Sequence, residues 1–170
     1  MPDLLKKIMK DLIFTLPESL GLLVFEGSIL EKMLAHRQTS FFSREAGGQL
    51  FAEIGGGVIR VVDATEPNKK DRRSRFAFWP HRPTEQIEIH KRFVEKKIHF
   101  VGDWHTHPEK VPHPSGSDAE SVKRIMNESH HDMLGILLVI VGTADIPDGL
   151  FVGFQTKTEL HILYPKLDGC

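Results

Sequence analysis

The stretch WHTHPEKVPHPSGSD, residues 104–118, constrains this chain most, because it places three side chains of metal-binding types close together. His105 and His107 lie in the segment HFVGDWHTH, whose β-branched and aromatic residues predict a strand. Side chains two residues apart on a strand share one face, so the two imidazoles point the same way. With Asp118 they would supply the three protein ligands of a catalytic zinc, which keeps a fourth position open for water.

Asp118 lies at the start of a predicted helix, from Ser117 to about residue 130, and a helix cap is its other interpretation. The apolar face of this helix consists of Ala119, Val122, Ile125 and Met126. Ser117 and Glu120 have the S-x-x-E spacing of a capping box, which leaves Asp118 free to bind a metal. Ser115 and Asp118 form an equally good S-x-x-D cap. The histidine pair alone also leaves metal binding open, since H-x-H can occur on a strand by chance.

Taken together, these residues resemble the signature of the JAMM (MPN, Mov34 or JAB1-type) zinc metalloproteins. That signature is H-x-H-P, six residues and then S-x-x-D, and this chain matches it from His105 to Asp118. The resemblance implies that His105, His107 and Asp118 bind one zinc ion per chain. It also implies that the Ser115 hydroxyl stabilises the oxyanion of the tetrahedral intermediate.

The JAMM signature includes an upstream glutamate, usually in a segment like E-T-G-G-[IL]-L. This chain has REAGGQLFAEI, so Glu45 takes that position and Ala46 replaces the threonine. The chemistry requires such a residue, because a base must collect the proton of the attacking water and return it to the leaving amine. The alternative is a solvated carboxylate before a glycine turn. Gly47 and Gly48 fit both readings, since glycine permits a close backbone approach as well as an ordinary turn.

Length and composition predict a single enzyme domain over residues 1–170. The net charge of −1 argues against nucleic acid as a partner. No apolar stretch approaches the roughly 20 residues of a membrane span, and the N-terminus lacks the features of a signal peptide. We therefore expect no membrane contact and a cytoplasmic location. The single cysteine, Cys170, excludes an intramolecular disulfide.

The remaining patterns predict an α/β fold with a mixed, curved sheet flanked by helices. A short amphipathic helix is expected within residues 1–16, outside the JAMM resemblance, which covers about residues 20–164. Strands are predicted at 19–27, 48–54, 57–66, 76–80, 98–106, 135–142, 150–155 and 159–164, and helices at 27–38, 84–97 and 117–130. Residues 55–57, all glycine, predict a hairpin. The resemblance implies the JAMM fold, which is similar to that of cytidine deaminases.

Two neighbours of the histidines have different expected positions. Trp104 should face away from the ligands by strand alternation and pack in the core behind the site. Asp103 is a possible acceptor for the second N–H of a metal-bound imidazole, but it shares the ligands' face only approximately. We leave its role unassigned.

The helix at 84–97 carries Ile87, His90, Phe93 and Val94 on one face. We therefore expect this face to pack inward, with His90 as a core histidine rather than a metal ligand.

The segment NKKDRRSR, with five basic residues between positions 69 and 75, interrupts the strand pattern. It is either a solvated connection or an exposed segment that guides a substrate tail. The second reading rests on the strand beside it, which could pair with an extended peptide.

JAMM enzymes cleave amide or isopeptide bonds at the C-terminus of ubiquitin or a ubiquitin-like protein. The resemblance therefore implies a zinc-dependent isopeptidase acting on a ubiquitin-like or similarly conjugated protein. The sequence GDWHTHP is close to GEWHTHP, which is typical of a bacterial subgroup found in CBASS antiphage operons. Resemblance to this subgroup implies removal of a cyclic-oligonucleotide synthase from its conjugation targets.

Two alternatives stay open. One is a processing peptidase that releases the Gly-Gly tail of a sulfur-carrier or ubiquitin-like precursor by cutting a linear peptide. The other is a non-catalytic MPN-type scaffold, although such members typically lack the ligands that are present here. The residues favour catalysis over scaffolding, but they hardly separate isopeptide from linear peptide substrates.

Overall fold

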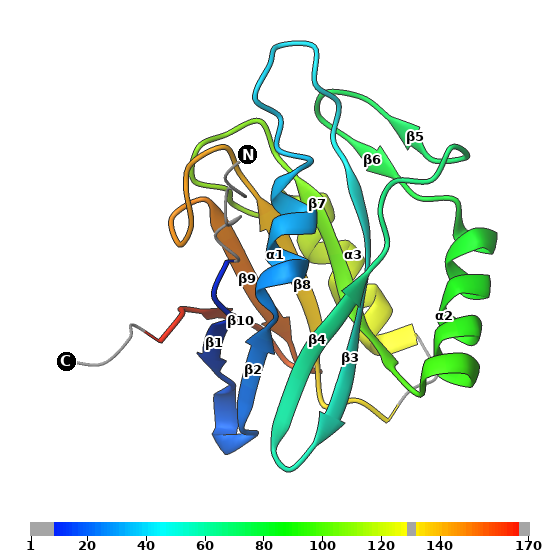
Figure 1. Ribbon diagram of the computed structural model, residues 1–170, viewed down its shortest axis with the longest axis vertical. Helices are drawn as coiled ribbons and strands as arrows, with labels where there is room; N and C mark the ends of the chain where they lie inside the picture. Colours follow the sequence, from blue (N-terminus) through cyan, green and yellow to red (C-terminus); the bar gives the residue numbers. More distant parts are fainter. Residues whose placement is uncertain (1–8, 129–131, 167–170) are drawn as a thin grey trace, which may run out of the picture.

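The computed structural model describes residues 9–128 and 132–166, which form one long sheet, a small hairpin and three α-helices. The large sheet has the strand order β1-β2-β4-β3-β7-β8-β9-β10 (Figure 1). Its strands are β1 (Leu12–Thr15), β2 (Leu22–Phe25), β3 (Gly47–Gly55), β4 (Val58–Ala64), β7 (His99–Thr106), β8 (Ile136–Val141), β9 (Leu150–Gln155) and β10 (Leu160–Leu163). The hairpin pairs β5 (Arg72–Arg73) with β6 (Phe78–Trp79), and the helices are α1 (Gly27–Leu34), α2 (Arg82–Lys96) and α3 (Gly116–Glu128).

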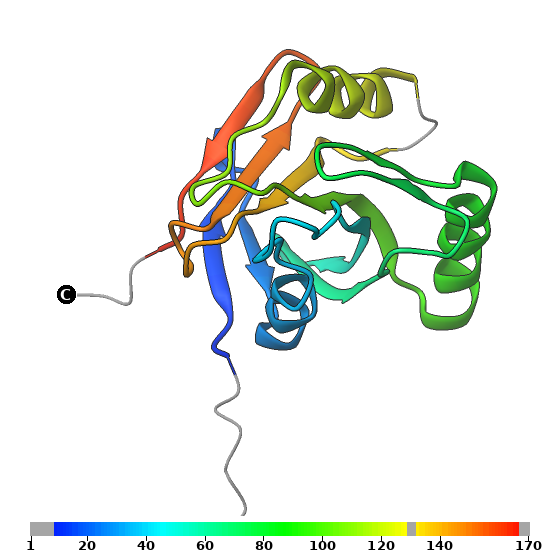
Figure 2. The same cartoon turned by 90° about the horizontal axis from the view of Figure 1, so that it is seen from above.

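The sheet is mixed and strongly curved. The pairs β2–β4 and β7–β8 are parallel, and the other neighbours in the large sheet are antiparallel. A bridge between Phe14 and Pro165 joins β1 to the segment after β10, so the two edges of the sheet meet. In the described part of the chain, α1 lies within the curve, whereas α2 and α3 lie on its outer side (Figure 2). The expectation of a mixed, curved sheet flanked by helices is confirmed.

Both faces of β8 are buried, and each contributes to a separate core. All six residues of β8 are apolar and buried. Leu137, Val139 and Val141 pack in the inner core with α1, whereas the alternate residues pack in the outer core under α3. Val122 and Met126 supply the α3 side of that outer core, as the predicted apolar face required. The outer core fixes α3 against the sheet and so fixes the place of its first residues.

The N-terminal prediction is wrong for the described residues. Residues 1–8 lie outside them, and Leu12–Thr15 form strand β1 rather than the end of a helix. Phe14 is buried in the inner core, and β1 pairs antiparallel with β2. The helical spacing of apolar residues is overridden here because the sheet edge offers both backbone partners and a place for Phe14.

The predicted orientation of α2 is also wrong. Its apolar residues Ile87, Phe93 and Val94 are at least half exposed, and His90 is exposed rather than packed in the core. The side of α2 that faces the sheet is mostly polar and includes the partly buried Glu85, Glu88 and Arg92. Arg92 faces inward because Asp63 of β4 accepts from its Nε, whereas Glu85 and Glu88 are paired with Arg82 and Arg92 of the helix itself.

Within the described ranges, no helix is both long and apolar enough to cross a membrane.

Candidate metal centre

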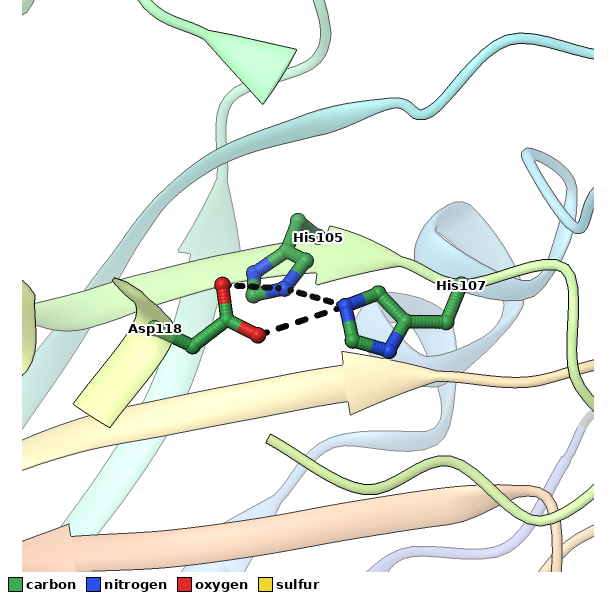
Figure 3. Close-up of side chains that lie close together, drawn as sticks. All are labelled: His105, His107 and Asp118. Atoms are coloured by element: carbon green, nitrogen blue, oxygen red, sulfur yellow. Dashed lines mark hydrogen bonds and ion pairs between the residues drawn. The ribbon is translucent and has the colours of Figure 1, made fainter. Parts of the chain in front are cut away.

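Three side chains from the end of β7 and the start of α3 converge on one point (Figure 3). His105 Nε2 lies 3.3 Å from Asp118 Oδ1, and His107 Nε2 lies 3.3 Å from Asp118 Oδ2. The two Nε2 atoms are 3.1 Å apart. These side chains form the only such group of three or more potential ligands found in the described residues, and we call it the His-His-Asp cluster. The sequence prediction that the three residues come together is confirmed.

The electrostatics of the cluster favour a cation at its centre. Burial acts to raise the pKa of Asp118, but hydrogen bonds and charge from His105 and His107 hold that pKa well below its usual range. Burial acts to lower the pKa of His107, but its hydrogen bonds to Asp118 and Glu109 outweigh burial and raise it to about 9. The lowered pKa keeps the Asp118 carboxyl group ionised near neutral pH, so the cluster holds a negative charge that attracts a cation.

Asp118 caps the helix and also faces the two histidines, so the two roles that the sequence left open are compatible. Its backbone N–H donates to Ser115 Oγ at 3.2 Å, and the backbone N–H of Ser115 donates to Asp118 Oδ2 at 2.7 Å. This reciprocal cap uses Ser115 and Asp118, and it is the arrangement found rather than the alternative pair Ser117 and Glu120. Ser117 Oγ instead lies 3.0 Å from Ser115 Oγ. The cap turns the aspartate toward the histidines, so capping and metal binding support one another.

Glu109 orients one of the histidines and was not anticipated from the sequence. The Nδ1 atom of His107 lies 3.0 Å from Glu109 Oε1, while its Nε2 faces Asp118. Histidines that bind metals commonly donate their second ring N–H to a carboxylate in this way. The one available signal was an acidic residue two positions after His107, in a loop whose course the sequence does not define.

Glu45 lies just before β3, beside the His-His-Asp cluster. Gly47, two residues later, pairs directly with His105 in the β3–β7 ladder. The Glu45 side chain is only 5% exposed, and burial, the largest cause, raises the pKa of its carboxyl group to about 7. The carboxylate of Asp118 also raises this pKa, whereas His107 lowers it. A carboxyl group with this pKa can both take up and release a proton near neutral pH.

A buried polar network holds Glu45 and β7 in register. The Thr106 hydroxyl donates to Gln38 Oε1 at 2.9 Å and accepts from the backbone N–H of Ala46 at 3.0 Å. Gln38 Nε2 in turn donates to the carbonyl of Arg75 at 2.9 Å. Gln38 and Thr106 are both buried, so each of them requires a hydrogen-bond partner within the protein. No local sequence pattern indicates this network, because its members are far apart along the chain.

A cleft of about 690 Å³ contains the cluster and opens beside the β5–β6 hairpin. It is lined by Glu45, Ser115 and the His-His-Asp cluster, so all five predicted site residues border one space. Hairpin residues Arg75 to Pro80 line its opposite wall. Arg73 Nε donates to the carbonyl of Glu45 at 2.6 Å, which fixes the hairpin to the glutamate.

Trp104 and Asp103 lie on opposite faces of β7. Trp104 is buried in the inner core and donates from Nε1 to the carbonyl of Thr65 at 2.9 Å, which confirms its predicted place behind the site. Asp103 lines the cleft, but no hydrogen bond joins it to His105 in the described structure, and its Oδ1 is buried without a partner. Asp103 therefore does not accept from a cluster imidazole. Glu109 has that role, and only for His107.

The donor set fits a zinc ion. Two imidazoles and one carboxylate are ligands typical of catalytic zinc sites, and three protein ligands leave one position open. The cluster is also largely buried: the side chains of His105, His107 and Asp118 are 12%, 13% and 17% exposed. A histidine must be neutral to bind a metal, so binding of a cation would release the proton that the raised pKa favours on His107.

Comparisons with known proteins agree with this geometry. A family described as prokaryotic homologs of the JAB domain matches residues 27–152. A protein of Vibrio cholerae named CD-NTase/cGAS isopeptidase is 33% identical over 155 residues, which cover 89% of this chain and 92% of that protein. A protein of the same name from Escherichia coli is 29% identical over 147 residues, which cover 85% of this chain and 88% of its own.

A solved structure shows the same fold. The solution structure of a Desulfitobacterium hafniense protein superimposes with a TM-score of 0.57 and 23% sequence identity, over 81% of this chain and 87% of that one. The similarity lies in the arrangement of the sheet and the helices.

Proposed function

Since the chain belongs to the prokaryotic JAB-domain family of JAMM proteins, we propose that it is a zinc-dependent isopeptidase that releases a conjugated protein. The observation that carries this proposal is the His-His-Asp cluster, with the buried Glu45 beside it in the same cleft. A scaffold would not require these ionisable groups to be partly buried together. When bound, a zinc ion supplies a Lewis acid that polarises a carbonyl group and makes a nearby water more acidic.

In the proposed reaction, water adds to the carbonyl carbon and the bond from that carbon to nitrogen breaks. Glu45 accepts a proton from the water and delivers it to the leaving amine. The Ser115 hydroxyl donates a hydrogen bond to the oxyanion that forms on the carbonyl oxygen. His105, His107 and Asp118 hold the metal, and Glu109 orients His107.

We further propose that the substrate is a CD-NTase joined to another molecule through its C-terminus. The relatives named CD-NTase/cGAS isopeptidase support this choice, because they align over most of both chains. The substrate tail would lie along the cleft beside the β5–β6 hairpin. Exposed Arg72, stacked on Trp79, is available to guide it. If Arg72→Glu left the KM for a conjugate unchanged at low and high salt, this guiding role would be wrong.

The first test is the zinc content of the purified protein, since it requires no substrate. We expect about one zinc per chain, lost in His107→Ala and retained in His90→Ala. His90 provides the matched control because it is an exposed histidine outside the cleft. A folded protein that bound no zinc even after reconstitution would favour the scaffold alternative.

Cleavage of a CD-NTase conjugate is the second test. Glu45→Gln should keep the zinc and lose turnover by at least about 10²-fold, the low end for a general base. The same tail should be offered both as a lysine isopeptide and as a linear fusion. Preferential cleavage of the linear fusion would favour a processing peptidase.

A further inference from the structure

Two buried acceptor atoms, one on β3 and one on β7, have no hydrogen-bond donor in the part of the chain that the structure describes. Gln49 of β3 is 2% exposed, and its Oε1 has no hydrogen-bond partner among the described residues. Asp103 of β7 has a buried Oδ1 that is equally unpartnered. The two residues are directly opposite in the antiparallel pair, so their side chains share one face of the sheet. Buried polar atoms are rarely left unpaired, so this pair of acceptors indicates a donor from outside the chain.

These acceptors border the cleft that holds the His-His-Asp cluster. Asp103 lines the cleft itself, and Gln49 lines an adjoining cavity of about 300 Å³. Gly48 and Glu85 line both spaces, so the two cavities meet at these residues. The space at the metal centre therefore adjoins both acceptor side chains.

The spacing along β7 sets the distance from the reacting bond. Asp103 precedes His105 by two residues, which is roughly 6.6–6.8 Å along a strand. An extended peptide lying over the cleft face of β7 rises by the same roughly 3.3–3.4 Å per residue. A side chain that reached Asp103 would thus belong to a residue about two positions from the bond that is cut.

The charges around Asp103 select a cationic group. Glu85 is already paired with Arg82, whose Nη1 lies 2.7 Å from Glu85 Oε2. Asp103 makes no ion pair with any residue that the structure describes, and the charge of Glu85 acts on it more strongly than that of Arg82. A neutral donor would leave this carboxylate uncompensated in a partly buried place, whereas an ammonium or guanidinium group would supply both charge and N–H donors.

We propose that Asp103 and Gln49, backed by Glu85, form a recognition subsite for a lysine or arginine side chain of the substrate. The subsite rests on the proposed function, because it lies in the same cleft, and it deepens that function by naming a feature of the sequence around the cleaved bond. Asp103 acts as the charged acceptor, and Gln49 supplies a second, neutral one.

A binding experiment with the zinc-loaded, full-length protein tests the subsite without turnover. The probes are methylguanidinium and its neutral analogue methylurea, followed by amide chemical shifts in ¹H–¹⁵N spectra. We expect methylguanidinium to shift the amides of Gln49, Asp103 and Glu85 saturably. Methylurea should bind at least about tenfold more weakly, because hydrogen bonds to charged groups are worth more than neutral ones.

Variants separate the subsite from the fold and from catalysis. Asp103→Asn should weaken methylguanidinium binding at least about tenfold, whereas Asp145→Asn, which removes an exposed carboxylate elsewhere, should not change it. Glu45→Gln should bind the probe like the wild type although it lacks turnover. Equal binding of both probes, unchanged binding by Asp103→Asn in a protein with a native spectrum, or no saturable binding would each overturn the subsite. A protein that bound methylguanidinium but cleaved no conjugate would instead contradict the proposed function.

Discussion

At the scale of single residues, Ser115 shows how one side chain can serve both fold and site. Its Oγ accepts from the backbone N–H of Asp118 at the start of α3, and it is also the proposed oxyanion donor. A hydroxyl can accept and donate at once, so the two roles are compatible. The cap keeps Asp118 turned toward the two histidines, and the Ser115 hydroxyl, which lies 3.0 Å from Ser117 Oγ, belongs to a residue that lines the cleft.

Replacing Ser115 separates these roles. Ser115→Ala should lose about 0.5–2 kcal/mol of stability, since a helix cap is removed. It should keep its zinc, because the backbone N–H that donates to the Asp118 carboxylate is still present. Turnover should fall on the order of 10²-fold or more if the hydroxyl binds the oxyanion. Urea unfolding, zinc content and conjugate cleavage measure the three effects separately. A rate equal to that of the wild type would leave Ser115 as a cap only.

The residues that the sequence identified are those whose positions follow local rules. His105 and His107 share a face because a strand alternates, and Asp118 lies at a helix start because serine and aspartate cap helices there. Gln38 and Thr106 could not be found in this way, since their hydrogen bond joins positions 68 residues apart. The orphan acceptor of Asp103 depends on what lies across the sheet, which strand periodicity does not reveal.

At the scale of elements, β3 requires a glycine where it passes β4 and Thr65. A Cβ added at Gly48 would lie 2.2 Å from the carbonyl oxygen of Thr65, so the two backbones would have to separate. Gly48→Ala should therefore lower the free energy of unfolding, measured with urea, by about 1–3 kcal/mol, the usual cost of overpacking. Gly55→Ala, in the same strand, is the matched control, since its Cβ would meet nothing within 4 Å. Similar losses in both variants would show that strand propensity, not contact, is responsible.

Ion pairs hold α2 on the sheet. Arg92 Nε donates to Asp63 Oδ2 at 2.9 Å, and Lys96 Nζ donates to the same oxygen at 3.3 Å. Burial acts to raise the pKa of Asp63, but these hydrogen bonds and the charges of Arg92 and Lys32 outweigh it, so its pKa is lowered. The aspartate of β4 thus replaces the apolar contact that α2 does not make.

Asp63→Asn should loosen α2 without unfolding the core. We expect the free energy of opening α2 to fall by about 1–2 kcal/mol at pH 7. The reason is that a hydrogen bond to a charged group is weakened, while Arg92 keeps Glu88 as a partner. A lowered folded pKa contributes stability above the unfolded value of about 3.9 and loses it as the pH falls through the folded value. The difference between variant and wild type should therefore shrink below about pH 4. Hydrogen exchange of the α2 amides measures it, and unchanged exchange at pH 7 would contradict this role.

The order and type of most elements could be predicted, but the orientation of α2 could not. Periodicity identified its apolar stripe correctly, yet that stripe faces outward because Arg92 on the other side of the helix pairs with Asp63 of β4. The strand β1 was missed for a related reason, since its partner strand decides its conformation. Both errors arise where tertiary partners override a local pattern.

At the scale of the whole molecule, the His-His-Asp cluster joins elements that otherwise meet through the outer core. β7 belongs to the middle of the sheet, whereas α3 packs on its outer side. Two imidazoles come from the strand and one carboxylate from the helix, so a bound ion would link them. A ligand that binds only the folded state raises its stability by mass action.

Removing the metal should therefore destabilise the entire domain. At a free zinc concentration about 100 times the Kd, chelation should lower the free energy of unfolding by about 2.7 kcal/mol. For a domain of this size, that change lowers the Tm by roughly 5–11 °C. The shift should be reversed by added zinc and absent from His107→Ala, whose midpoint should already equal that of the metal-free wild type. Thermal unfolding with and without a chelator measures it. If chelation removed the zinc but left the Tm of the wild type unchanged, the cluster would bind metal without coupling β7 to α3, and Glu45 and Ser115 would have to be positioned by the protein network alone.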